Sequence, residues 1–155
     1  MEKNNSLFHW HNYTALSTVL IAVLAAITSL WTSSTSSLIL LEKNNSNYYQ
    51  AKANKVWNYY LANDITTTIL KRPSDQTIQQ GFQQQAEGLE RQADASTVKA
   101  SVYFEKNNHF TTAGILFEVA IALSAMAVLV KKRMVWIFSL FLAAVGIYFL
   151  LQGLM

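Results

Sequence analysis

Three apolar blocks constrain this chain more than any other feature of its sequence. They cover residues 15–31, 110–130 and 134–154, near the two ends of a chain of 155 residues. At ~1.5 Å rise per residue, each of the last two is long enough to cross a ~30 Å hydrocarbon layer as a helix. The first block is shorter, but neighbouring residues can extend it at both ends. This distribution predicts an all-α membrane protein with three transmembrane helices.

A cleavable signal peptide is the alternative interpretation of the first block. Lys3 precedes this block and small residues at 33–37 follow it. The apolar run is long for that role, because the apolar region of a signal peptide usually spans ~7 to 15 residues. In either case the two C-terminal blocks would hold the protein in the bilayer.

The segment between the first and second apolar blocks, residues 37–109, contains the chain's single proline, Pro73. Proline disfavours helix in the residue before it, and Ser74 or Asp75 can cap a new helix just after it. We therefore expect a turn at 71–76 that divides the segment into two helical arms of nearly equal length. Equal arms that begin and end at the membrane predict a long antiparallel helical hairpin, or stalk.

The expected organisation therefore has three parts. Residues 1–36 hold the N-terminal segment and the first transmembrane helix, and residues 37–109 form the extramembrane hairpin. Residues 110–155 hold the second and third transmembrane helices, which are joined by a basic turn at 131–133.

The basic cluster Lys131-Lys132-Arg133 determines the expected orientation. It makes up the whole connection between the last two apolar blocks, and short basic loops are strongly retained in the cytoplasm. We therefore expect the N-terminus inside, and the hairpin and the C-terminal Met155 outside. Several lysines and arginines also lie in the hairpin, but long translocated segments largely escape the charge rule.

Composition excludes two further classes of function. The chain has no cysteine, so disulfides and thiolate metal sites are excluded. Its net charge of +3 is modest, and its basic residues are scattered over the hairpin apart from the cluster at 131–133. This scattering argues against a nucleic-acid surface.

An aromatic stripe is expected on the first arm of the hairpin. The pair Tyr48-Tyr49 recurs as Tyr59-Tyr60, and the offset of 11 residues is close to three helical turns. Each tyrosine should therefore lie over its counterpart, with Trp57 joining the stripe. Packing between the arms or between subunits is the favoured interpretation, and a ligand-binding aromatic patch is the alternative.

The order Trp57-x-Tyr59-Tyr60 within residues 53–65 also carries a resemblance. This stretch resembles an uncharacterised bacterial membrane family that is catalogued as a domain of unknown function. Members of that family have one N-terminal transmembrane helix, a soluble helical stretch and two closing helices. Residues 109–133 are similar to its closing segment. The resemblance implies a bacterial inner-membrane location and brings no known activity.

Glu118 is the clearest candidate for a functional residue, because it lies well inside the second transmembrane helix. An ionisable side chain at such depth costs roughly 2.5–3.5 kcal/mol and usually faces a bundle interior or a water-filled cavity. No lysine or arginine lies within the three apolar blocks, so we expect Glu118 to be protonated or hydrogen-bonded. Counting depth from the outer helix ends places three residues level with it: Thr28, Ser29 and Tyr148. A hydrogen bond that fixes helix packing is the favoured interpretation, and an ion or proton path is the alternative.

The three histidines, His9, His11 and His109, lie near the expected membrane boundaries. The first two are two residues apart, a spacing that does not place both side chains on one helical face. No nucleophile–base pair, glycine-rich phosphate loop or carboxylate pair stands out. We therefore expect no metal site, no cofactor and no enzyme activity.

Small residues recur along one predicted face of the first transmembrane helix: Thr14, Thr18, Ala22, Ala25, Ser29, Thr32 and Ser36. Such faces let helices approach closely in lipid. The favoured hypothesis is a non-enzymatic membrane scaffold in the lipid bilayer that self-associates as a homo-oligomer. The alternative is a small oligomeric ion or proton channel that uses Glu118 and the polar face of the first helix.

Overall fold

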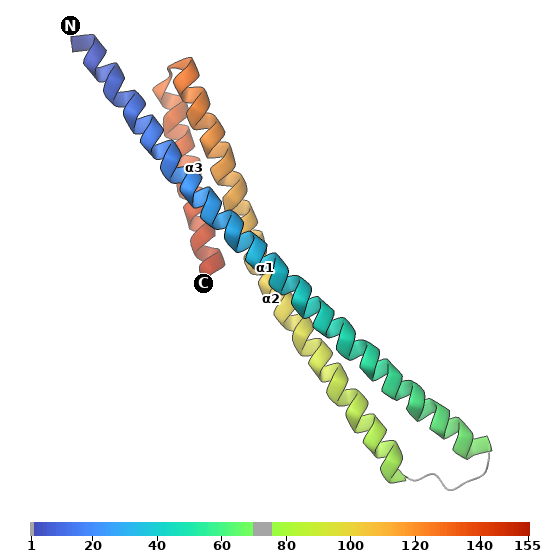
Figure 1. Cartoon of the computed structure of the whole chain (residues 1–155). Coiled ribbons are helices and arrows are strands. Elements are labelled where there is room, and N and C mark those ends of the chain that lie inside the picture. Colours follow the sequence, from blue (N-terminus) through green and yellow to red (C-terminus); the bar gives the residue numbers. More distant parts are fainter. Residues whose placement is uncertain (1, 70–75) are drawn as a thin grey trace. The chain divides into compact units, whose positions relative to one another are not determined.

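The computed structural model describes residues 2–69 and 76–155. These residues form three helices: α1 (Glu2–Ile69), α2 (Gln76–Val130) and α3 (Arg133–Leu154) (Figure 1). The described ranges contain no strand, so the all-α prediction is confirmed. Pro73, with residues 71–75 of the expected turn, lies outside the described residues.

Each of the three helices is long and apolar enough to cross a membrane. A helix of ~20 residues already spans a bilayer. Helices α1 and α2 are much longer than this and continue well beyond their apolar blocks. The predicted fold class, with three spanning helices and a long helical extension of the first two, is therefore confirmed.

The chain divides into two compact units. The first consists of Met1–Ser36 and Phe104–Met155 and is called the three-helix unit below, and the second is Ser37–Tyr103, the hairpin unit. The three-helix unit contains all three apolar blocks. The membrane boundaries expected near residues 36 and 110 remain predictions.

The core of the three-helix unit pairs aromatic rings on α2 with small residues on α3. Buried positions on α3 recur at intervals of three and four residues: Ser139, Ala143, Gly146, Leu150 and Gly153. On α2 they are Phe110, Ala113, Phe117, Ala120, Ser124 and Ala127. Helix α1 adds Thr14, Ile21 and Thr28. In lipid, small residues on facing helices allow close backbone approach, and here they leave room for the two rings.

The hairpin unit is built on residues that recur every seven positions. Ile39, Ser46 and Ala53 are buried on α1, and Ala86, Ala93 and Ala100 are buried on α2. A seven-residue interval keeps successive side chains on one side of a helix. Alanine and serine at these positions let the two arms lie close together.

The two arms run antiparallel, because later residues of α1 bond to earlier residues of α2. Ser46 and Thr97 share a hydroxyl–hydroxyl hydrogen bond of 2.9 Å. Trp57 Nε1 donates to Glu90 Oε1 at 2.8 Å. The predicted antiparallel packing of the hairpin is thus confirmed.

A tight turn joins α2 to α3. Lys131 has a φ of 52°, in the left-handed region where residues other than glycine are uncommon. Its backbone N–H donates to the carbonyl of Val128 at 3.4 Å, and the N–H of Val135 donates to the carbonyl of Lys132 at 3.3 Å. The turn therefore reverses the chain over two residues and places the side chains of Lys131, Lys132 and Arg133 in the open.

Candidate functional site

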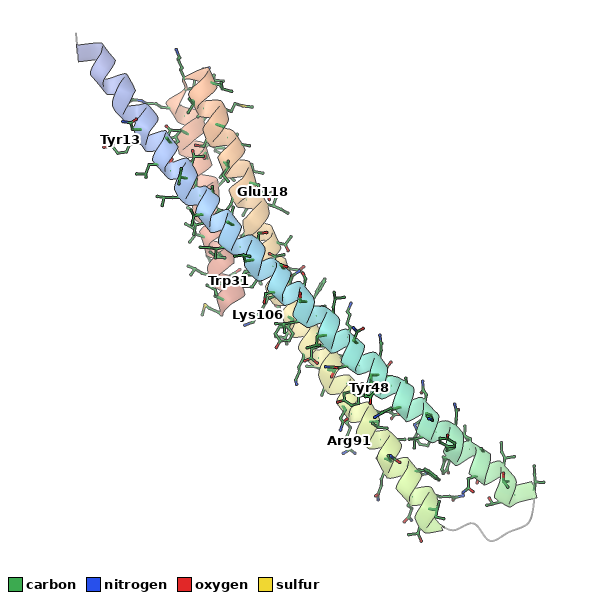
Figure 2. The ribbon with its side chains drawn as sticks, viewed as in Figure 1. Tyr13, Trp31, Tyr48, Arg91, Lys106 and Glu118 are labelled. Atoms are coloured by element: carbon green, nitrogen blue, oxygen red, sulfur yellow. The ribbon has the colours of Figure 1, made fainter. Side chains whose placement is uncertain are left out.

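Glu118 lies on the exposed side of α2 in the three-helix unit, outside the buried core (Figure 2). A hollow of about 170 Å³ between α1 and α2 lies beside it. Its lining residues come from both helices: Ala25, Ser29, Thr32, Thr111, Gly114, Ile115 and Glu118. We refer to it as the Glu118 hollow.

Helical periodicity explains why these side chains meet. Residues three or four positions apart on a helix share one face, so Thr111, Ile115 and Glu118 form one wall on α2. Ser29 and Thr32 are related in the same way on α1. The hollow is therefore a groove with hydroxyl groups at its edges and one carboxyl group on its wall.

Two of the hydroxyl groups in the hollow are already bonded within their own helices. Thr32 Oγ1 donates to the carbonyl of Thr28 at 3.0 Å, and Thr111 Oγ1 donates to the carbonyl of Asn107 at 2.8 Å. The side chains of Ser29 and Glu118 make no hydrogen bond or ion pair with any described residue. These two side chains therefore hold the unused hydrogen-bonding capacity of the hollow.

Thr28 and Tyr148 do not join Glu118. Thr28 is buried, its hydroxyl donates to the carbonyl of Leu24 at 2.7 Å, and its methyl group lies near Gly114. Tyr148 is exposed on α3, where its hydroxyl accepts a hydrogen bond of 2.8 Å from Gln152 Nε2. Of the three residues predicted to be level with Glu118, the structure brings only Ser29 into the same hollow.

The predicted aromatic stripe on the hairpin divides into an inner and an outer set. Tyr49, Trp57 and Tyr60 are half-buried, whereas Tyr48 and Tyr59 are exposed. The rings of Trp57 and Tyr60 meet edge to face, with centroids 5.6 Å apart. The inner set packs at the contact between the two arms.

Each exposed tyrosine of the outer set lies beside a lysine of the same helix. Lys52 Nζ is 4.5 Å from the ring centroid of Tyr48, and Lys55 Nζ is 6.0 Å from that of Tyr59. Figure 2 marks Tyr48 on the α1 arm. Cation–π contacts at exposed sites contribute about 0.5–1 kcal/mol, so these pairs order an exposed face rather than hold the fold together.

A second, larger hollow of about 550 Å³ was not predicted from the sequence. It lies between α1 and the last turns of α2, and its lining residues are Asn12, Thr14, Ala15, Thr18, Val19, Ser124, Ala125 and Val128. The hydroxyl groups of two lining residues, Thr18 and Ser124, lie 2.6 Å apart and share a hydrogen bond. Hydroxyl-bearing residues inside two apolar blocks were the sequence signal that could have indicated a hydrogen bond between the helices. We refer to this second hollow as the Val128 groove.

The remaining polar candidates with described side chains do not form a reactive cluster. His109 stacks on Phe149, with centroids 6.2 Å apart. Among the residues whose side chains are described, no group of three or more His, Asp or Glu could hold a metal ion. The side chains of His9 and His11 lie outside that part of the chain.

The helices and the placement of Glu118 define a class: an all-α membrane protein in which two spanning helices extend into an antiparallel hairpin. More particularly, the chain belongs to the family described as Domain of unknown function (DUF4337), which matches residues 10–155. This match confirms the family resemblance drawn from the Trp57 region. No curated protein and no solved structure matches the chain.

Proposed function

We propose that this protein is a non-enzymatic membrane scaffold that self-associates through the Glu118 hollow. One observation carries the proposal: a carboxyl group without a bonded partner among the described residues stands on the exposed side of an apolar helix. In a single copy this group would face hydrocarbon, at a cost of roughly 2.5–3.5 kcal/mol. A second copy that covers the hollow removes the group from lipid.

The chemistry of the hollow suits contact between identical chains. The Ser29 hydroxyl can donate and accept, and a carboxyl group accepts, or donates when protonated. In a two-fold dimer each surface meets itself. Ser29 of each copy can then bond to Glu118 of the other, so that both side chains gain a partner at once.

The hairpin unit supports the scaffold role. The seven-residue recurrence of Ala86, Ala93 and Ala100 on α2, facing a similar series on α1, is the spacing of an antiparallel coiled coil. A coiled coil is a stiff spacer, and this one presents Tyr48 and Tyr59 on its surface. We place the protein in the bacterial inner membrane with its hairpin on the outer side, because the turn at 131–133 is basic.

Self-association can be tested with single cysteines, since the chain has none of its own. Ser29→Cys and Ile115→Cys each place a thiol in the Glu118 hollow. Phe141→Cys is the matched control, because Phe141 is also exposed, on α3. Under oxidation in lipid nanodiscs, the first two variants should form disulfide-linked dimers and the control should not.

Mass measurement completes this test. The wild type should have more than one copy per particle in mild detergent. A monomer at every concentration would refute self-association, and dimers cross-linked only through Phe141→Cys would move the interface to α3.

A small proton- or ion-conducting pore is the second candidate function. The observation that favours it is the hydroxyl lining of the Glu118 hollow, from Ser29, Thr32 and Thr111, because conduction needs a polar, hydrated track. An unpaired acid in an apolar helix is a costly residue that such a track would explain.

Flux through proteoliposomes separates the two functions. Wild type and Glu118→Gln are compared at matched density across about pH 5 to 8. A pore requires wild-type flux that depends on pH and falls in the variant. If the wild type gives no flux above that of empty liposomes, the pore is excluded.

A further inference from the structure

At the end of the three-helix unit where α2 turns into α3, a basic cluster follows directly on a residue that lines an apolar groove. Lys131, Lys132 and Arg133 are all exposed. Val128, whose carbonyl accepts the backbone N–H of Lys131, also lines the Val128 groove. Lys131 is therefore within one helical turn of a lining residue of the groove, and Lys132 and Arg133 follow it directly in the chain.

Among the residues whose side chains are described, this charge has no acidic neighbour. No Asp or Glu occurs between residues 12 and 41 or after Glu118, and the side chain of Glu2 lies outside the described part. The side chains of Lys131, Lys132 and Arg133 make no ion pair with a described residue. The cluster is therefore open to an anion from outside the chain.

The groove itself suits a hydrocarbon chain. Ala15, Val19, Ala125 and Val128 give it apolar walls. Its central hydroxyls are already paired with each other, since Thr18 and Ser124 lie 2.6 Å apart. A volume of about 550 Å³ falls within the ~300–1,000 Å³ of typical ligand sites.

The conformation of Lys131 is a separate observation on the same cluster. Its φ of 52° is the left-handed conformation in which glycine is the usual residue at a helix C-terminus. A lysine there carries a backbone strain of about 1–3 kcal/mol. Its exposed side chain adds a third cation to the cluster.

We propose that this end of the three-helix unit binds an anionic phospholipid, with its phosphate on Lys131, Lys132 and Arg133 and one acyl chain in the Val128 groove. The proposal is independent of self-association. Basic pockets between membrane helices are a recognised way to hold acidic head groups. The lipid would couple the α2–α3 turn to the start of α1, because the groove has walls from both helices.

The test is lipid binding to the purified full-length protein, counted by native mass spectrometry from detergent with added phosphatidylglycerol or phosphatidylcholine. Phosphatidylglycerol should bind more tightly and with a fixed stoichiometry. Neutralising the cluster (K131Q, K132Q and R133Q together) should weaken its binding by roughly 100-fold. The matched control neutralises three exposed lysines of the hairpin unit (K43Q, K55Q and K99Q) and should bind as the wild type does.

Filling the groove tests the position of the acyl chain without changing charge. Ala125→Phe and Ala15→Phe approach it from opposite walls, and both positions are exposed in the single chain, so at least one variant should fold. Each should lower the affinity for phosphatidylglycerol. Lys131→Gly should also lower it while raising the melting temperature, because it relieves the backbone strain.

Four results would overturn the proposal. Equal affinity for the two lipids would show that the head-group charge is not recognised. An equal loss of phosphatidylglycerol affinity in the hairpin-unit control would show that only the net charge of the protein matters. Unchanged affinity in both groove-filling variants would remove the acyl chain from the groove. A change in oligomer mass in those variants without a change in lipid binding would assign the groove to a second copy of the chain.

Discussion

Phe117 on α2 lies directly against Gly146 on α3. A β-carbon at position 146 would lie 2.8 Å from Cε1 of the Phe117 ring, and one at position 153 would lie 2.6 Å from the same atom of Phe110. The two glycines therefore set how closely α3 approaches α2. The rings fill the space that they leave.

This relationship predicts that Gly146→Ala destabilises the three-helix unit by about 1–3 kcal/mol, because an overpacked contact forces the ring or the helix to move. Gly114→Ala is the matched control, since its new methyl group would lie 3.8 Å from Thr28 Cγ2, an ordinary contact. Thermal unfolding in detergent should show a lower melting temperature only for Gly146→Ala. Equal melting temperatures for the two variants would contradict the packing.

In the hairpin unit, Ala93→Leu should cost about 1–3 kcal/mol of unfolding free energy, because Ala93 is buried between the arms and the added atoms push them apart. Ala95→Leu is the same chemical change on the exposed side of the same helix and should stay within about 0.5 kcal/mol of wild type. Hydrogen exchange of the full chain measures both. Faster exchange on both arms around residue 93 should appear in Ala93→Leu alone.

The sequence predicted which segments are helical, and physical chemistry explains why. Runs such as 110–130 are apolar apart from a few polar residues, and in lipid only a helix or closed barrel satisfies the backbone. The long polar arms of α1 and α2 carry no proline in their described interiors. Helical type and approximate length therefore follow from local composition.

The sequence did not predict which face of a spanning helix is buried. Thr28 and Ser29 are adjacent residues that both carry a short hydroxyl side chain, yet Thr28 packs inside and Ser29 lines the Glu118 hollow. In water, polarity separates the two faces of a helix, but lipid is as apolar as a protein core, so that signal is lost. Ala22, on the predicted small-residue face, is likewise exposed.

The sequence also did not predict the contact between Phe117 and Gly146. This contact depends on the register between α2 and α3, and hydropathy along one helix carries no information on the level at which its neighbour packs. The small residues Ser139, Ala143 and Gly146 are all buried. Nothing in the sequence of α3 indicates which large residues of α2 pack against them.

The Thr18–Ser124 contact predicts a measurable coupling between α1 and α2. Thr18 Oγ1 donates its one hydrogen to the carbonyl of Thr14 at 2.7 Å, so Ser124 must be the donor in the 2.6 Å contact between the two hydroxyls. A double-mutant cycle of Thr18→Val and Ser124→Ala should give a coupling of about 0.6 kcal/mol, the average for hydrogen bonds between membrane helices. Unfolding in bicelles measures it, and fully additive effects would show that the bond contributes nothing.

The last prediction concerns orientation, which follows from the position of the basic turn. Trp136 Nε1 donates to Ser17 Oγ at 3.1 Å, so the start of α1 and the turn at 131–133 lie at the same end of the three-helix unit. If that turn is retained in the cytoplasm, Asn12 must be near the inner surface and Met155 near the outer one.

Single cysteines in this cysteine-free chain test the orientation directly. In intact cells, a maleimide that cannot cross the membrane should label Met155→Cys and Gln92→Cys, whose positions are exposed, and leave Asn12→Cys unlabelled until the membrane is opened. Gln92 lies in the hairpin and Met155 follows α3. Two spanning helices separate these positions, so both must be on the same side of the membrane. If Asn12→Cys alone were labelled in intact cells, the orientation would be the opposite of the predicted one, with the hairpin in the cytoplasm. The lysines and arginines of the hairpin would then determine the orientation more strongly than the short basic turn does.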